Sequence, residues 1–574
     1  MDISSIINAM HSPESNPQRN GFDLSHRKVL TYKAGELLPI LVKECVPKDY
    51  IEVDLAALVR SVSPLNTAAF MRSKIYFDFF FVPMTSVWRN FDKFYYQRDD
   101  NYSSYTNSAA YEPNITILDI NRLLQYGSTS SPVDSQESRC KLVNLLGYGN
   151  WINEDTLDYE STGDYAAIGV KSLTALPIYA YNRIYNLHYR DAWKDAPSPN
   201  AVRDMSADDI VCSSYANSVI DKITNSNDHN FIRMHYHRYP QDLFIGLLPS
   251  QQFGSVSSVS MSSDLVFQDY SQIPASLGSA VVGRQSADNR VVFSDSNDST
   301  KYTIGVSSSN FDVIALRRAI AAQKWKEYNA RAGWKAGKQA KAMFGVNTPD
   351  DRKHDVEFID SYAFPVMVDE VVQQSATVSS GGTTQALGEL AGKVIGVGNG
   401  HKIKYNVGER HGYFFCISYI LPQVEYNAVG IDKQLVRSTP ESHYMPAFAN
   451  LGLEAVYKFE LDALSQSVAE SQKFDATLGF TTRYHEYKTD VDKVYAEFQT
   501  GGSLQSWVTV RRDLQNAVAS GSIPLSLLYV NPIILDTVFL AQASPSISTD
   551  QFMVNVNFDL KMVRPMSALG LPTL

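Results

Sequence analysis

The stretch FMVNVNFDLKM, residues 552–562 near the carboxyl end of the chain, alternates between two kinds of side chain. The apolar set comprises Phe552, Val554, Val556, Phe558, Leu560 and Met562. Met553 and polar residues occupy the positions between them. Successive side chains of a β-strand point to opposite faces of the sheet. A period of two over the whole stretch therefore predicts a strand with one buried face.

Further strands are predicted toward both ends of the chain. Residues 72–83 alternate in the same way and end at Pro83, which has no N–H to donate to a ladder. Residues 413–421 are apolar on both faces, as in a central strand. Weaker candidates are residues 27–32, 50–58, 477–487 and 491–499. Because strands at the two ends must pair to form one sheet system, we interpret the long middle as insertions.

The middle of the chain has a different composition. Residues 127–137 and 255–310 are rich in Ser, Gly, Asp and Asn, which favours turns and exposed loops. A short helix is predicted over residues 177–189, and a longer one over residues 312–343. Asp312 can cap the longer helix, and we expect Gly333 and Gly337 to divide it into two pieces.

Length, composition and net charge limit the class of protein. The chain has 574 residues, of which 44% are hydrophobic, with 33 Tyr and 27 Phe, and this suits β-structure and large buried interfaces. A net charge of -10 excludes a general polycation.

The cysteines form no CxxC pair, so free thiols in a reducing compartment are expected: Cys45, Cys140, Cys212 and Cys416. Residues 1–20 lack a signal-peptide pattern, and no apolar run is long enough to span a bilayer, which predicts assembly in a cytoplasm without membrane insertion.

One local segment is strongly basic. Residues 317–341 hold eight basic residues against Glu327 alone, which gives 8 − 1 = +7, and Trp325, Tyr328 and Trp334 lie among them. Cations follow phosphates and rings stack on bases, so this pattern suits single-stranded nucleic acid. The candidate nucleic-acid-binding residues are Arg317, Arg318, Lys324, Lys326, Arg331, Lys335, Lys338 and Lys341. The alternative is a solvated basic helix, or one that pairs with acidic neighbours.

Catalytic and metal-binding motifs are not found in the sequence. His235 and His237 could share a strand face, but no third ligand can be assigned, so we interpret them as structural or surface histidines. No GxSxG, Walker A, HExxH or Rossmann fingerprint occurs, and no acid–base pair can be singled out. The sequence thus predicts no catalytic residues, no metal site and no cofactor.

Six ordered blocks of residues resemble the major capsid protein of microviruses, on the gokushovirus and alpavirus side of that family. The first two blocks comprise Phe22-Asp23-Leu24-Ser25, Gly35-Glu36-Leu37-Leu38-Pro39, Arg60, Pro64-Leu65, Phe80-Phe81-Val82-Pro83 and Trp88, then Leu176-Pro177, Ala180-Tyr181, Ile184, Asn186 and Tyr189-Arg190-Asp191. The third and fourth comprise Asp242, Phe244, Leu248-Pro249, Gln252 and Gly254, then Leu316-Arg317, Ala319, Gln323-Lys324, Glu327, Ala330-Arg331, Gly333, Phe344-Gly345-Val346, Asp351-Arg352 and Glu357. The last two comprise His411-Gly412, Pro422 and Tyr426, then Arg483-Tyr484, Glu486-Tyr487, Trp507, Asn531-Pro532, Asp536, Asp550, Phe552, Arg564-Pro565-Met566, Gly570 and Pro572.

The resemblance implies a mainly β fold, a single eight-stranded antiparallel viral jelly roll with long inter-strand insertions. It implies sixty copies in a T=1 icosahedral shell around circular single-stranded DNA, assembled in the host bacterial cytoplasm. Partners would be a small DNA-binding or scaffolding protein, a pilot protein and a host surface receptor that the outer loops contact. The expected divisions are an N-terminal arm (1–26), jelly-roll strands (27–126), surface insertion loops (127–310), a basic helical segment (311–360), and further jelly-roll strands with a C-terminal arm (361–574).

Two other functions remain open at the level of sequence. A carbohydrate-binding or glycan-active β-sandwich protein could share the fold, since fold does not fix function. A decoration or spike protein is the other alternative, although a protein on the outside of a shell has no need of a basic segment that binds DNA.

Overall fold

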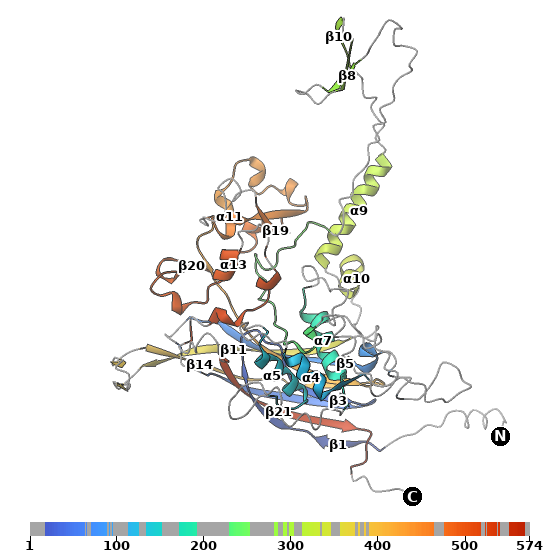
Figure 1. The fold of residues 1–574 in the computed structure, drawn as a ribbon, viewed down its shortest axis with the longest axis vertical. Coiled ribbons are helices and arrows are strands. Elements are labelled where there is room, and N and C mark those ends of the chain that lie inside the picture. The colour runs from blue at the N-terminus through green and yellow to red at the C-terminus, as the bar shows by residue number, and fades with distance from the viewer. Residues whose placement is uncertain are drawn as a thin grey trace, which may run out of the picture. The chain divides into compact units, whose positions relative to one another are not determined.

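The strand predicted over residues 552–562 lies at the junction of the two ends of the chain. In the computed structural model, β21 (Phe552–Arg564) pairs antiparallel with β4 (Tyr50–Ser61) along one edge, and with β1 (Asn20–Asp23) and β2 (His26–Tyr32) along the other. Figure 1 shows β21 in red beside the blue amino-terminal strands. The predicted alternation is confirmed, because Val554 and Val556 are buried while Met553 and Asn557 are exposed.

The structure describes most of the chain in separate ranges. These are residues 18–62, 65, 70–88, 91, 95, 113–125, 134–151, 172–191, 229–252, 281–284, 291–295, 298–303, 313–332, 336–345, 356–372, 377–378, 384–385, 390–463, 476–517, 523, 525–535, 538–539 and 550–568. They fall into two compact units, a main unit (residues 1–250 and 347–574) and an inserted unit (residues 251–346).

An antiparallel sheet system forms the frame of the main unit. Its eight strands follow the order β1-β21-β4-β14-β11-β5-β16-β3, with β2 added beside β21 and β15 beside β4. The members not yet bounded are β3 (Leu38–Cys45), β5 (Ser73–Pro83), β11 (Glu357–Val372), β14 (Leu390–Asn399), β15 (Ile403–Asn406) and β16 (Gly412–Pro422). Residues 357–366 of β11 pair with β5 and residues 367–372 pair with β14, so the sheet curls along one continuous strand. The expected mainly β, eight-stranded jelly roll is confirmed.

A single hydrophobic core joins the strands from both ends of the chain. Strand β16 is buried along its whole length between β5 and β3, which confirms the predicted central strand. The ring of Tyr405 on β15 lies 5.6 Å from the ring of Phe81 on β5 and 6.4 Å from that of Phe414 on β16. Each such buried ring contributes roughly 1.5–3 kcal/mol relative to exposure. The core therefore bridges the two halves of the curled sheet.

Helices from the middle of the chain complete this core. Helix α5 (Gln136–Leu146) begins where the hydroxyl of Ser135 accepts a hydrogen bond from Ser138 N, and it ends at Gly147, whose φ of 99° is left-handed. Helix α7 (Leu176–Ile184) continues as a π-helical turn through Tyr189, as predicted, and nearly all its side chains are buried. The segment expected to form surface loops, residues 127–310, thus includes helices that pack against the core.

The remaining elements of the main unit are short. They are α2 (Met84–Val87), β6 (Asn114–Thr116), α4 (Ile117–Gln125), β7 (Ser172–Thr174), β12 (Thr377–Val378), β13 (Thr384–Gln385), β17 (Tyr426–Asn427), β18 (Leu453–Tyr457), α11 (Lys458–Leu461), β19 (Thr477–Thr482), β20 (Lys493–Val494) and α13 (Arg512–Ala517). Turns of 3₁₀ helix occur at His229–Ile232, Lys433–Leu435, Pro440–Ser442, Pro446–Phe448, His485–Tyr487, Ala496–Phe498, Gln505–Trp507, Leu525–Leu527 and Pro532–Leu535.

Two of the weaker strand predictions require correction. The strand expected over residues 477–487 ends at Thr482, and the one expected over residues 491–499 is limited to β20. Ala496 has a φ of 54°, a left-handed conformation that breaks an extended run, and β20 pairs over only two residues with β17. Within the described part of the chain, no further strand extends this ladder.

The inserted unit contains a small sheet and helices. It holds an antiparallel sheet of β8 (Val281–Arg284), β9 (Val291–Asp295) and β10 (Asp298–Thr303), and the helices α9 (Val313–Ala332) and α10 (Ala336–Phe344). The predicted division of the long helix near Gly333 is confirmed, although Gly333 itself lies outside the described residues. A break at Gly337 was wrong, because Gly337 lies within α10; a single helical glycine costs only about 1 kcal/mol.

Candidate nucleic-acid interface and other polar sites

The basic segment lies on the two helices of the inserted unit. Helix α9 carries Arg317, Arg318, Lys324, Lys326 and Arg331, and α10 carries Lys338 and Lys341. The side chains of Arg317, Arg318, Lys324, Arg331 and Lys341 are exposed and that of Lys326 is half-buried, while Lys335 lies outside the described residues. Among the described residues, no carboxylate pairs with Arg317, Arg318 or Lys324. Neutralisation of these cations by acidic neighbours is therefore not observed.

Aromatic side chains are exposed between these cations. Trp325 and Tyr328 are 55% and 49% exposed, and Lys324 Nζ lies 5.9 Å from the centre of the Tyr328 ring. Glu327, the one acidic residue of the segment, is half-buried and accepts a hydrogen bond from Gln323 Nε2 at 3.0 Å. Exposed rings beside exposed cations can stack on unpaired bases while the cations contact phosphates. The geometry therefore provides both elements of a single-strand interface.

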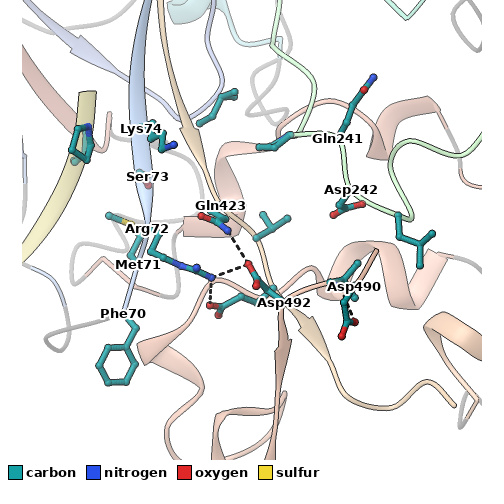
Figure 2. A pocket seen from close by; sticks show the side chains of 18 of the residues that line it. Phe70, Met71, Arg72, Ser73, Lys74, Gln241, Asp242, Gln423, Asp490 and Asp492 are labelled. Carbon is teal, nitrogen blue, oxygen red and sulfur yellow. Dashed lines mark hydrogen bonds and ion pairs between the residues drawn. The ribbon is translucent and has the colours of Figure 1, made fainter. Parts of the chain in front are cut away.

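A concave site of the main unit has an arginine ion pair in its wall. A cavity of about 1120 Å³ is lined by the start of β5, by residues 240–246, and by parts of β11, β16 and the 489–492 segment. Figure 2 shows Arg72 pointing toward Asp492, with Gln423 beside it. The guanidinium lies 2.9 Å from Asp492 Oδ2 and 3.2 Å from Glu425 Oε1, and Gln423 Nε2 donates to the same Asp492 oxygen.

The carboxyl groups around this cavity are engaged in structural contacts. Burial raises the pKa of Glu425, and the neighbouring Arg72 charge partly opposes this effect. Asp242 accepts hydrogen bonds from the hydroxyl of Tyr426 at 2.6 Å and from the backbone N–H groups of Phe244 and Ile245. These ion pairs and hydrogen bonds connect Gln423, Glu425 and Asp492 to Arg72, which directly precedes β5.

A buried ionic cluster connects three distant segments. Lys141 Nζ on α5 lies 3.0 Å from Glu36 Oε2, in the turn before β3, and 2.8 Å from Asp550 Oδ2, just before β21. Burial alone would raise the pKa of Asp550, but the ammonium groups of Lys141 and Lys33 outweigh burial and lower it. Sequence reasoning missed this cluster, because its members are 105 and 409 positions apart and carry no local motif.

The two histidines singled out in the sequence pack beside core aromatic residues, His235 as a buried side chain and His237 as a half-buried one. His235 Nε2 lies 2.8 Å from Asn182 Oδ1, and its ring stacks on Tyr185 at 3.8 Å. His237 Nδ1 lies 2.5 Å from the carbonyl oxygen of Arg238, and burial lowers the pKa of His237 to about 4. Three of the cysteines, Cys45, Cys140 and Cys416, are buried free thiols as expected, and Cys212 lies outside the described residues. These histidines and thiols are packing residues of the described core.

The surface of residues 433–495 exposes several large apolar side chains. Leu435, Tyr495 and Leu451 are 77%, 63% and 60% exposed, and Tyr444 and Tyr487 are about half exposed. The 3₁₀ turns Lys433–Leu435, Pro440–Ser442 and Pro446–Phe448 contain no buried residue. Aromatic side chains that are exposed in one subunit and anchored on a stiff backbone are typical of protein–protein contacts.

Among the described helices, none is long and apolar enough to cross a membrane.

Comparisons with known proteins agree on one family. The profile of the family described as capsid protein (F protein) matches residues 11–119 and 147–574. The chain is 24% identical to capsid protein VP1 of Chlamydia phage 1, over 98% of this chain and 96% of the relative. It is 23% identical to capsid protein VP1 of Bdellovibrio phage phiMH2K over the same shares, and 22% identical to capsid protein VP1 of Spiroplasma virus 4 over 77% and 76%.

Proposed function

The chain belongs to the phage capsid protein (F protein) family and is a major capsid protein, and from that premise we propose that sixty copies close into a T=1 icosahedral shell around a circular single-stranded DNA genome. Residues 27–126 and 361–574 supply the strands of the shell barrel, to which β1 is added by its pairing with β21, so the proposed amino-terminal arm shortens to the residues before Asn20. The carboxyl end serves as the second arm. The shell assembles in the host bacterial cytoplasm, with a small DNA-binding or scaffolding protein and a pilot protein as further partners.

The observation that carries shell formation is the exposed apolar surface of residues 433–495. A closed shell needs several contact patches on every subunit, related by different symmetry axes. Burying one exposed leucine in such a contact contributes roughly 1.5–3 kcal/mol, which is about a 10- to 100-fold change in the association constant. We place Leu435, which is 77% exposed, at one of these contacts.

Leu435→Glu is expected to yield a folded subunit that no longer closes into particles. The side chain lies outside the core, so thermal unfolding of the subunit should be unchanged while particles disappear in electron micrographs. Gln434→Glu adds the same charge on the same exposed 3₁₀ turn and should still give closed particles of uniform size. Normal particles from Leu435→Glu would rule out a subunit contact at this position.

The basic segment is proposed to bind the packaged DNA. Its support is the exposure of Arg317, Arg318 and Lys324 together with Trp325 and Tyr328 on α9. The remaining candidates, Lys326, Arg331, Lys335, Lys338 and Lys341, extend the same positive charge along the segment. Each phosphate contact contributes about 0.7 to the dependence of log K on log salt for single strands. This slope provides a direct measure of the contacts.

Arg317→Gln combined with Lys324→Gln is expected to reduce the salt slope for a single-stranded oligonucleotide by about 1.4 and to lower the DNA content of particles. Fluorescence anisotropy across a salt series measures the slope. The matched control is Lys393→Gln with Lys488→Gln, which removes two exposed charges elsewhere. Equal slopes for the two double variants, with normal DNA content, would contradict a DNA contact at α9.

The same variants test the proposed contact with the host. Residues 255–310, proposed as the outer loops that meet a host receptor, belong to the same compact unit as α9. Packaged DNA lies inside a shell and a receptor meets its outside, so the DNA contact and the host contact are competing proposals for the inserted unit. If the α9 variant particles package DNA normally but adsorb poorly to host cells, the inserted unit faces outward.

A further inference from the structure

A histidine and three glutamates gather in the carboxyl-terminal part of the main unit. Glu454 lies on β18, Glu460 on α11, and His485 and Glu486 on the 3₁₀ turn that follows β19. Antiparallel pairing of β18 with β19 brings these segments together. Tyr484, just before the turn, has a left-handed φ of 59°, and its N–H donates to Glu454 Oε2 at 2.8 Å. Such strain in a residue other than glycine is often found at functional sites.

The imidazole of His485 is held in one orientation. Its side chain is 1% exposed, and its Nε2 lies 2.8 Å from Glu460 Oε2. The other oxygen of Glu460 accepts from the N–H of Tyr457 at 2.9 Å. Because Glu460 is an acceptor, the proton of a neutral imidazole resides on Nε2, and the lone pair is on Nδ1. Carboxylates orient metal-binding histidines in this way.

Two buried polar atoms face each other without a hydrogen-bond partner. They are Nδ1 of His485 and Oε2 of Glu486, whose side chain is 9% exposed. The two atoms are 4.0 Å apart, beyond hydrogen-bonding distance. Leaving such groups unsatisfied costs roughly 1–3 kcal/mol each, and more for a charged group. A bound species between them would relieve this cost.

The space and the charge beside these atoms suit a cation. A small cavity of about 70 Å³ is lined by Glu460, His485 and Glu486, and also by Lys433 and by the ion pair of Lys493 with Asp432. Lys433 Nζ lies 2.5 Å from Glu454 Oε1 and is the ammonium group in contact with the cluster. The three glutamates of the cluster therefore outnumber the ammonium groups in contact with them. Lys433 contacts Glu454 and leaves the atoms of His485 and Glu486 unpartnered.

We propose that His485 Nδ1, Glu486 and Glu454 bind a divalent transition-metal ion of the Zn²⁺ class, with Glu460 as the positioning residue. One possible ligand atom of each lies within 4.8 Å of the others. Tetrahedral Zn²⁺ with bonds of about 2.0–2.2 Å brings its ligand atoms to roughly 3.3 Å apart, so the three side chains need to close by up to about 1.5 Å. One imidazole with carboxylates favours Zn²⁺ over Ca²⁺ or Mg²⁺, and water in the cavity can complete the coordination.

The ion would connect β18 to the 3₁₀ turn after β19, in a part of the subunit that has little helix or strand. Gly430, where a Cβ atom would collide with the carbonyl of Glu460, allows the 431–436 turn to pass close to α11. That turn carries the exposed Leu435, so the metal would hold the proposed contact surface in place. Metal binding and local folding are coupled when ligands come from separate segments.

The test uses the full chain, stripped with a chelator and then titrated with Zn²⁺ and, as a spectroscopic probe, Co²⁺. We expect one Zn²⁺ per chain by elemental analysis and a rise in unfolding temperature on Zn²⁺ addition. Glu486→Gln should lower the affinity at least tenfold and remove the temperature shift. Glu460→Gln should weaken binding by about 10- to 100-fold because the imidazole is no longer oriented.

Glu441→Gln is the control, because Glu441 is an exposed residue of the same region that pairs with Arg483. It should bind Zn²⁺ as the unchanged chain does. A chain that takes up neither Zn²⁺ nor Co²⁺ in stoichiometric amounts would overturn the proposal and leave water in the cavity. Unaltered Zn²⁺ affinity in Glu486→Gln would overturn it as well. Neither result bears on whether the subunit forms a shell.

Discussion

Val554→Asp is expected to yield no folded subunit, whereas Met553→Asp, one position away, should fold and assemble. Val554 is 1% exposed on β21, where it is paired with Leu30 of β2 and Val59 of β4. The substitution loses about 1.5–3 kcal/mol of apolar burial and adds a buried carboxyl group without a partner, at a cost of several kcal/mol. The sum approaches the whole stability of a typical domain, about 5–15 kcal/mol.

Met553 provides the control for this variant. Its side chain is 38% exposed and faces the other side of the sheet, where Met553 is paired with Arg60 of β4. An aspartate there gains a nearby cation and stays in contact with water, so the expected change is within about 0.5 kcal/mol. Soluble yield, circular dichroism and electron microscopy of both variants give the comparison. Folded Val554→Asp protein would mean that the two ends of the chain do not share one core.

Lys141→Met is expected to destabilise the subunit by about 3–5 kcal/mol at neutral pH, because it removes one partner of a buried ion cluster. Glu36, which is fully buried, and Asp550 would then face each other without the ammonium group between them. Lys33 is the remaining cation nearby, and its Nζ lies 3.4 Å from Glu137. Lys561→Met is the matched control: Lys561 pairs with Asp559 on the surface, and its loss should cost at most about 1 kcal/mol.

The pH dependence of this variant has a definite sign. In the unchanged chain the pKa of Asp550 is lowered, so its contribution to stability is present above its ordinary pKa and is lost as the pH falls through the folded value. Without Lys141, burial would raise the pKa of Asp550 with only Lys33 and the hydrogen bond from Thr31 to oppose it, so protonation at acid pH would stabilise the variant. Urea unfolding at pH 7 and near pH 4 should therefore show a smaller difference at acid pH. A constant difference would mean that Lys141 acts through packing alone.

Replacing the whole cluster separates charge from shape. Lys141→Met combined with Glu36→Gln and Asp550→Asn removes all three charges and keeps similar volumes. Because neutral replacements avoid an uncompensated buried charge, we expect most of the lost stability to return. A triple variant as unstable as Lys141→Met alone would show that the geometry of the cluster, rather than its charge balance, holds α5 against β3 and β21.

Local patterns in the sequence predicted the strands of the barrel well. Strands β5, β16 and β21 follow from alternation or a continuous apolar run, because each buries one or both faces against the core. The strand predicted over residues 491–499 was wrong beyond β20, because Ala496 adopts a left-handed φ and β20 pairs over only two residues with β17. The basic residues of α9 and α10 were visible as composition, and the structure adds the exposure of Arg317, Arg318, Lys324, Arg331 and Lys341 and that of Trp325.

Residue order and short-range periodicity were enough to identify the capsid family, the strands at both ends of the chain and the basic helices. The tertiary structure was needed to find which strands pair, that helices of the middle segment complete the core, and that Lys141 meets Glu36 and Asp550. It also brought His485 to Glu454 and Glu460 from segments 25 and more residues away. Such contacts arise when elements fold back on one another, and their partners share no spacing that a linear pattern could reveal.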